Sequence, residues 1–119
     1  MLNNATKNTF KKVYIACGRT DLRYGVTGLA TLVKCSHHLN PYDKGTLFLF
    51  CGRRTDRIKA LLWEGDGFLL MSKYLCDGHF RWPRDSSELR NLTYEQYRLL
   101  MDGFSVDGSI KEGQPKYLV

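Results

Sequence analysis

Arginines gather in two short stretches of this sequence, in arrangements that suit phosphate binding. Three of them lie at one predicted hairpin tip: Arg53, Arg54 and Arg57. A guanidinium group offers several N–H donors in a fixed fork that matches phosphate oxygens. Arg19 and Arg23 flank Asp21 just before a helical pattern, where backbone N–H groups can also receive a phosphate. The alternatives are a tip kept soluble by its charge and a solvated turn with a local ion pair.

Aromatic residues such as Trp63 and Tyr74 are interleaved with these cations. Exposed rings can stack on unpaired bases, at about 1–3 kcal/mol per base, while cations neutralise the phosphates. The pattern therefore favours a surface that binds nucleic acid or a protein partner. Its candidate residues are Arg19, Asp21, Arg23, Arg53, Arg54, Arg57, Lys59, Trp63, Lys73, Arg81 and Trp82.

Carboxylates offer a different chemistry, that of a metal-dependent nuclease. Phosphoryl transfer at two metals needs converging carboxylates, and the candidates are Asp21, Asp56, Glu64 and Asp66. Three of the four fall in predicted turns, where Asp has a structural use. The sequence has no Ser-His-Asp or Cys-His signature and no phosphate-binding P-loop. We therefore predict no catalytic residue.

The cysteines and histidines do not predict a metal site. None of the four cysteines belongs to a CxxC pair, and the three histidines do not supply ligand spacing for zinc. Free cysteine is among the most buried residue types, so we expect these to be buried thiols in a reducing cytosol. We predict no metal and no cofactor.

Length and composition indicate one globular domain. The chain has 119 residues, of which 43% are hydrophobic and 25% charged. Its net charge of +6 favours an anionic partner, most commonly nucleic acid. No apolar run resembles a secretory signal or approaches the roughly 18 residues of a membrane span. We expect a soluble cytoplasmic protein without a membrane partner.

Apolar runs separated by Gly/Asp clusters, between residues 46 and 83, are typical of consecutive β-hairpins. They predict a three-stranded antiparallel meander, which a short strand at residues 79–82 would extend. Pairing Trp63 with Phe68 gives an aliphatic face for the core and a mixed face of aromatics and cations. The mixed face carries Phe48, Phe50, Arg57, Lys59, Leu61, Trp63, Phe68, Leu70, Ser72 and Tyr74.

The first part of the chain predicts a strand and a helix. Residues 13–17 are short, apolar and β-prone. Apolar residues recur at helical spacing over residues 22–33. Thr20 or Asp21 could cap this helix, although two glycines also allow it to begin as late as Val26.

The last part predicts a second helix after a polar surface loop at residues 84–91. Thr93 and Gln96 form a capping box, and Gly103 is the expected left-handed stop after about Asp102. The predicted fold is α+β: an antiparallel β-meander of four to five strands with two principal helices in a single domain, residues 13–104. We expect residues 1–12 to be a flexible N-terminus and residues 105–119 to be a mobile tail.

Six motifs in order resemble the small accessory protein (TnpB) of the insertion-sequence-66 family of bacterial transposons. They are Thr20–Gly25, Asn40–Tyr42, Leu47–Phe50, Asp56–Lys59, Leu62–Phe68 and Phe80–Pro83. The resemblance spans about residues 13–104. It implies an accessory factor for efficient transposition, working beside a separate and larger transposase, and it supplies no catalytic residues. The positions that match the family motifs are Asp21, Arg23, Arg57, Lys59, Trp63, Asp66, Gly67, Arg81, Trp82 and Pro83.

The leading hypothesis is a non-catalytic accessory factor in DNA transposition that binds nucleic acid, such as transposon ends, through its basic and aromatic sheet face and turns. The alternative is an adaptor that docks on the transposase or self-associates through an apolar patch of Phe48, Phe50, Trp63 and Phe68. A metal-dependent nuclease ranks third. In a fourth possibility, helices cover both sheet faces, leaving only the tip arginines and the Arg81-Trp82 segment for partners.

Overall fold

The hydrophobic runs between residues 46 and 74 form the antiparallel meander that the sequence predicts. We describe residues 1–107 from a computed structural model. The meander consists of β2 (Thr46–Cys51), β3 (Arg57–Trp63) and β4 (Phe68–Tyr74). Trp63 pairs with Phe68, as predicted, so both face assignments are confirmed.

Two further strands complete a five-stranded mixed sheet within the described residues, in the order β4-β3-β2-β1-β5. The first is β1 (Lys12–Ala16), which runs parallel to β2, and the second is β5 (Leu89–Leu92), which runs antiparallel to β1. The α+β class and the mostly antiparallel sheet are therefore confirmed. β5 overlaps the polar run that we predicted to be a surface loop, so that prediction is wrong for its last residues.

The predicted strand at residues 79–82 does not form. Phe80 and Trp82 are buried while His79 and Arg81 are exposed, so the segment shows the alternation of a strand. No sheet pairing includes it, and its side chains pack onto the aliphatic face of the sheet instead. The strand prediction is therefore wrong, and so is the use of Trp82 as an exposed ring, since its side chain belongs to the core.

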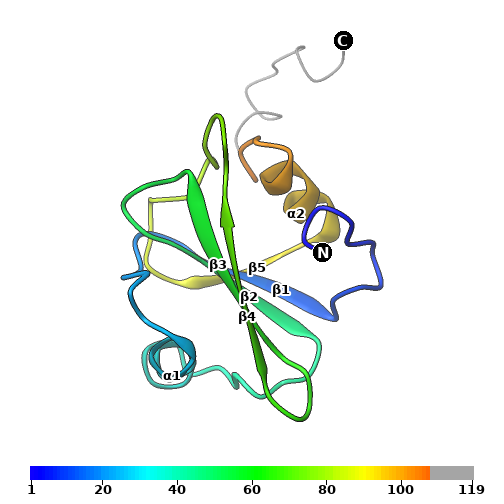
Figure 1. The fold of residues 1–119 in the computed structure, drawn as a ribbon, viewed down its shortest axis with the longest axis vertical. Helices are drawn as coiled ribbons and strands as arrows, with labels where there is room; N and C mark the ends of the chain where they lie inside the picture. Colours follow the sequence, from blue (N-terminus) through cyan, green and yellow to red (C-terminus); the bar gives the residue numbers. More distant parts are fainter. Residues whose placement is uncertain (108–119) are drawn as a thin grey trace.

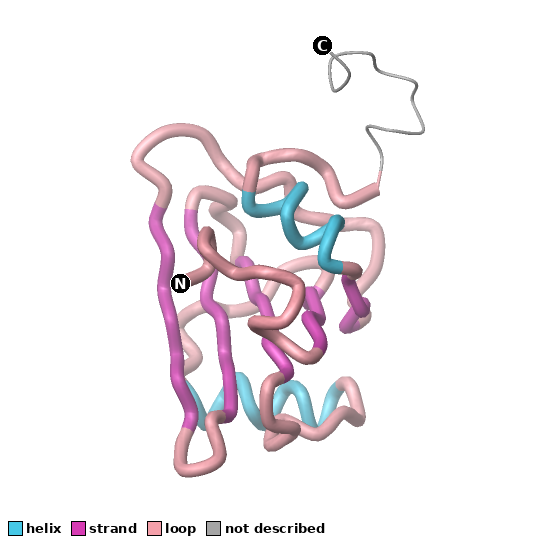
Figure 2. Tube along the Cα trace, turned by 90° about the vertical axis from the view of Figure 1, so that its right-hand side faces the viewer, coloured by secondary structure: helices cyan, strands magenta, loops and turns pink. Residues whose placement is uncertain are grey.

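Both faces of the sheet are covered, one by each helix (Figures 1 and 2). The helix α1 (Val26–Thr31) continues into a π-helical turn, η1 (Leu32–Ser36), and packs on Phe48, Phe50 and Leu61 of the mixed face. The helix α2 (Tyr94–Met101) covers the aliphatic face. The fourth possibility above therefore holds for the centre of the sheet, whose aromatic residues are core. Neither helix is long or apolar enough to cross a membrane, within residues 1–107.

The two helices begin differently. α1 starts at Val26 after Gly25, without a side-chain cap, so the late start is confirmed and the caps predicted at Thr20 or Asp21 are wrong. Asp21 instead binds Arg23 in the preceding turn. α2 has the predicted capping box of Thr93 and Gln96. It ends at a left-handed Gly103, whose neighbour Phe104 donates its N–H to the carbonyl of Leu99 at 2.8 Å.

The segment before β1 packs against the core. Leu2, Ala5 and Phe10 are all less than a tenth exposed, and the hydroxyl of Tyr97 donates to the carbonyl of Leu2 at 2.6 Å. Of the segment after α2, Val106 is buried, and residues 108–119 of the predicted tail lie outside the described residues. The division into a 13–104 domain with loose ends stays a prediction.

Candidate functional site

Two turns meet at one end of the sheet and border an open hollow of about 630 Å³. One is the turn between β1 and α1, and the other joins β2 to β3. We call the hollow the arginine groove. Its lining residues are Arg19, Thr20, Asp21, Leu22, Arg23, Gly52, Arg53, Arg54, Arg57 and Tyr74. Six of the eleven predicted site residues, including both arginine stretches, therefore lie around one cavity.

Backbone contacts hold the two turns together. The N–H of Thr20 donates to the carbonyl of Cys51 at 2.8 Å. A Cβ atom on Gly52 would come within 3.2 Å of the Thr20 carbonyl oxygen, so a glycine permits this close approach. Gly18 has a φ of +81°, the left-handed region that glycine adopts without a steric penalty. The two turns are thus in direct contact because a glycine stands at position 52, where they meet, while Gly18 allows a close approach to Ser86.

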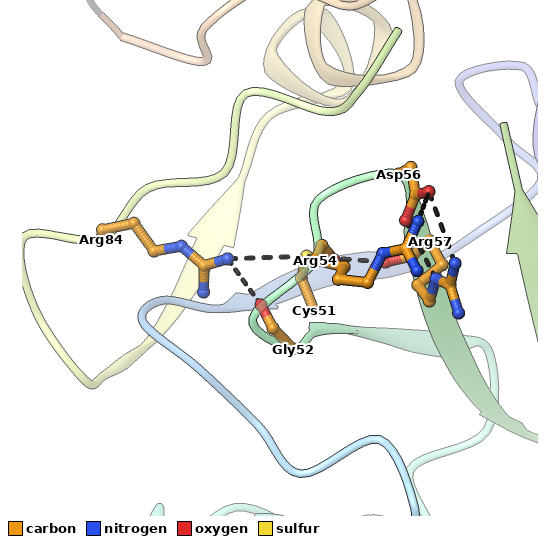
Figure 3. A network of polar contacts seen from close by, with 6 residues as sticks. All are labelled: Cys51, Gly52, Arg54, Asp56, Arg57 and Arg84. Carbon is orange, nitrogen blue, oxygen red and sulfur yellow. Dashed lines mark hydrogen bonds and ion pairs between the residues drawn. The ribbon is translucent and has the colours of Figure 1, made fainter. Parts of the chain in front are cut away.

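Arg84 joins the same two turns from a third segment, and Figure 3 shows its contact with the turn at Gly52. Its guanidinium group donates to the carbonyl of Gly18 and, at 2.6 Å, to the carbonyl of Gly52. These two glycines directly precede Arg19 and Arg53 in the chain. A single side chain therefore fixes the backbone on both sides of the groove.

Two aspartates neutralise part of the charge in and beside the groove. Asp21 pairs with Arg23 at 2.7 Å, and this hydrogen bond lowers the pKa of Asp21 to about 2. Asp56 accepts from both Arg54 and Arg57 at 2.9 Å (Figure 3), and the hydrogen bond from Arg57 is the main cause of its lowered pKa. Both carboxylates are therefore ionised at neutral pH.

Arg19 and Arg53 remain without an ion pair or side-chain hydrogen bond to any residue in the described part of the chain. Both are exposed. Since their backbones are fixed and their guanidinium groups are free, they are the cations of the groove best placed to accept an external anion.

Tyr74 lies at the rim of the groove, beside Arg57 on the neighbouring strand. The Arg57 guanidinium carbon is 4.7 Å from the centre of the Tyr74 ring, within the range of a cation–π contact. Tyr74 is nevertheless 63% exposed. The groove therefore has one accessible aromatic ring, whose position is supported by a cation.

The other predicted site residues are dispersed. Lys59 donates to the carbonyl of Tyr24 at 2.9 Å, next to the groove. Lys73 is on the opposite sheet face, where it bonds the side chain of Asn3 at 2.6 Å. Arg81 is exposed in a separate hollow beside the segment after α2.

The two tryptophans do not stand beside the arginines. Trp82 is 6% exposed and donates its indole N–H to the carbonyl of Ala16 at 2.9 Å, so it has no free face for a base. Trp63 is half-buried at the opposite end of β3, in contact with Tyr42 and Phe68. The adaptor patch proposed from the sequence is also broken up, because Phe48 and Phe50 are at most 1% exposed.

The carboxylates considered for a nuclease do not converge. Asp21 and Asp56 are engaged by arginines near the groove. Glu64 and Asp66 follow the far end of β3, a strand of seven residues that spans roughly 20 Å. Among residues 1–107, no three His, Cys, Asp or Glu side chains are arranged to hold a metal ion.

Arg84 is the site residue that the sequence did not reveal. It stands in a polar run that resembles an exposed loop, and its acceptors are backbone carbonyls 32 and 66 positions away in the chain. Carbonyl acceptors carry no side-chain signature, so no pattern in the sequence could have identified them.

The chain is similar to proteins of one family. A family model described as IS66 Orf2-like protein matches residues 11–110. The uncharacterized protein y4jC of Sinorhizobium fredii is 32% identical over 92 residues, which make up 77% of this chain and 78% of that protein. The uncharacterized protein y4hO of the same organism is 37% identical over 92 residues, or 77% of this chain and 79% of that protein. No solved structure matches the chain.

Proposed function

The chain belongs to the IS66 Orf2-like family of transposition-associated accessory proteins, and on that premise we propose that it binds DNA through the arginine groove. In this proposal the groove holds the phosphate backbone, and the protein performs no chemistry on the DNA itself. The turns at the end of the sheet provide the contact surface, because α1 covers the centre of the mixed face.

The observation that carries the proposal is the charge of the groove. It contains five arginines, and the two aspartates that pair with them leave an excess of three positive charges. Excess cations that line a cavity raise the local concentration of anions. A phosphate backbone offers a row of such anions, and each neutralised phosphate releases counterions from the DNA. Binding of this kind depends steeply on salt and weakly on sequence.

The adaptor alternative has less support. Of its predicted patch, Trp63 and Phe68 remain partly accessible, and Tyr42 joins them at 52% exposed. Aromatic residues are enriched at protein interfaces, yet three rings in contact with one another also form an ordinary edge of the core. The arginine groove has no comparable structural use, because Arg19 and Arg53 bind nothing in the described part of the chain.

Fluorescence anisotropy with labelled transposon-end DNA would test the proposal, at about 50 and 200 mM salt. We expect the double variant Arg19→Gln, Arg53→Gln to bind at least about tenfold more weakly at the lower salt. The slope of log affinity against log salt should fall by about 2, since each lost phosphate contact lowers it by about 1.

The matched control is the double variant Lys34→Gln, Lys44→Gln, which removes the same charge from exposed positions outside the groove. Its binding should stay close to that of the wild type. The proposal fails if the wild type does not bind DNA at the lower salt. It also fails if the control pair weakens binding as much as the groove pair does.

A further inference from the structure

We infer that the arginine groove takes an unpaired segment of DNA, with Tyr74 stacking on one of its bases. The inference rests on the proposed function, which it deepens by naming single-stranded DNA as the ligand. Three features of the groove support it: its shape, the elements that line it and the exposure of its one ring.

The shape of the site suits a single strand. Proteins commonly read a DNA duplex by inserting a helix or a strand ribbon into one of its grooves, which requires an element that projects from the protein. The arginine groove is instead a hollow of about 630 Å³. The hollow is open to solvent, and its volume falls within the range of ligand-binding clefts, roughly 300–1,000 Å³. A stretch of one or two nucleotides can enter such a hollow, whereas a duplex can only lie across its rim.

The helices are not available as reading elements at this place. None of the lining residues belongs to α1 or α2. α1 has Leu29 fully buried against the mixed face, and α2 lies on the opposite face of the sheet (Figure 1). The groove is lined by two turns and by side chains at the adjoining ends of β3 and β4. The groove therefore offers a ligand side-chain donors and backbone groups, and no helix projects from its lining residues.

Tyr74 supplies an aromatic ring for base stacking, which a purely electrostatic site lacks. Proteins that bind single strands combine a cationic groove with aromatic rings on which bases stack, and stacking tolerates any base. Tyr74 is 63% exposed, and the Arg57 guanidinium group supports its ring at 4.7 Å. Arg57 is in turn held by Asp56 at 2.9 Å. Arg57 thus holds the Tyr74 ring in the same groove as the unpaired Arg19 and Arg53. An exposed tyrosine on an edge strand does not need such a contact in order to fold.

The test compares a labelled single-stranded oligonucleotide with a hairpin duplex of the same sequence. At low salt we expect the wild type to bind the single strand at least about tenfold more tightly than the duplex. Tyr74→Leu should weaken single-strand binding by roughly 5- to 150-fold, the range for one lost stack. Tyr74→Phe keeps the ring and should bind as the wild type does. The salt dependence of binding should be the same for all three proteins, because no phosphate contact changes.

A second measurement observes the stack directly. Oligonucleotides with 2-aminopurine at successive positions should show quenching at one position on binding to the wild type and to Tyr74→Phe, but not to Tyr74→Leu. Duplex binding that is as tight as single-strand binding would overturn the inference. So would a Tyr74→Leu variant with unchanged single-strand affinity. In both cases salt-dependent binding through the arginines would leave the proposed function standing, whereas absence of binding to either DNA at low salt would remove both.

Discussion

Asp56 holds two of the five groove arginines with a single carboxylate. Its oxygens accept from Arg54 and from Arg57, each at 2.9 Å. The pairing orders the rim of the groove, and under the proposed function it would also compete with phosphate for both guanidinium groups. If the groove binds DNA as proposed, Asp56 therefore favours binding by ordering the arginines and opposes it by neutralising part of their charge.

Asp56→Asn should raise DNA affinity about two- to fivefold at low salt, because the loss of one partly exposed ion-pair partner changes the free energy by only a fraction of a kcal/mol. Glu64→Gln, at the far end of β3, alters the net charge by the same amount and should leave affinity nearly unchanged. Anisotropy titrations of both variants measure this. Equal gains for the two would show that net charge alone governs binding, with no contribution from the local pairing.

The same substitution has a pH signature. Because the pKa of Asp56 is lowered in the folded protein, its contribution to stability is present above the unfolded value of about 3.9 and is lost as pH falls through the folded pKa. The Asn variant should be less stable than the wild type at pH 7, and the difference should shrink toward pH 2. Urea midpoints at several pH values would show a constant difference if the carboxylate contributed nothing.

At the scale of elements, local signals in the sequence predicted much of the structure. The hairpin register at Trp63 and Phe68 and the capping box at Thr93 depend only on neighbouring residues, and both are confirmed. The parallel β1–β2 pair and the strand β5 depend on partners far along the chain. β5 reads Leu-Arg-Asn-Leu, without β-branched or aromatic residues, so its pairing with β1 is decided by the tertiary structure.

The residues that line the groove could be predicted from the sequence, but the way in which they meet in space could not. Both arginine stretches were identified from residue type and spacing. Their meeting depends on the close approach of Thr20 to Gly52 and on the bonds of Arg84 to two carbonyls. The prediction that the aromatic sheet face is exposed was wrong for a related reason. Alternation along a strand shows that a face is apolar, but it does not show which helix covers that face.

The Arg84 bridge yields a prediction at this scale. Arg84→Met should lower the free energy of unfolding by about 1–3 kcal/mol, because two turn carbonyls lose a charged donor. Amide hydrogen exchange should become faster in the free protein at Gly18 and Thr20, whose N–H groups donate to the carbonyls of Pro83 and Cys51. DNA affinity should fall while the salt slope stays that of the wild type, since Arg84 positions the groove and does not contact phosphate.

Arg84→Lys is the matched variant, because it keeps the charge but cannot place two donors in a fixed fork. It should show the same faster exchange as Arg84→Met. If the salt slope of Arg84→Met fell by about 1, Arg84 would itself be a phosphate contact and not a positioning residue. Unchanged exchange in both variants would mean that the backbone contacts of Thr20 with Cys51 and Gly52 hold the turns without Arg84.

At the scale of the whole molecule, the N-terminal segment closes the aliphatic face together with α2. Three side chains of α2 donate to its backbone carbonyls: Tyr94 to Ala5, Tyr97 to Leu2 and Arg98 to Asn3. Burial raises the pKa of Tyr97 to about 12, so its hydroxyl remains a donor throughout the neutral range. Stability that depends on this protonated hydroxyl is present below about pH 10 and is lost as pH rises toward the folded value.

If the segment docks as one unit, changes to its two sides should not be additive. Leu2→Ala should lower the free energy of unfolding by about 1–3 kcal/mol through lost burial. Tyr97→Phe should lower it by about 0.5–1.5 kcal/mol through the lost hydrogen bond. In the double variant the loss should be smaller than the sum by about 0.5 kcal/mol or more, because a segment that has already detached has no second contact to lose.

Urea denaturation of the four proteins in this cycle measures the coupling. Leu2→Ala combined with Tyr42→Ala is the control, since Tyr42 packs on Trp63 and Phe68 of the opposite sheet face, and that pair should add within about 0.5 kcal/mol. If the losses in the free energy of unfolding at Leu2 and Tyr97 simply add, each contact holds the segment independently of the other. A coupled result would make the N-terminal segment part of the folding unit. Truncations that remove it would then weaken DNA binding indirectly, by destabilising the sheet that positions the arginine groove.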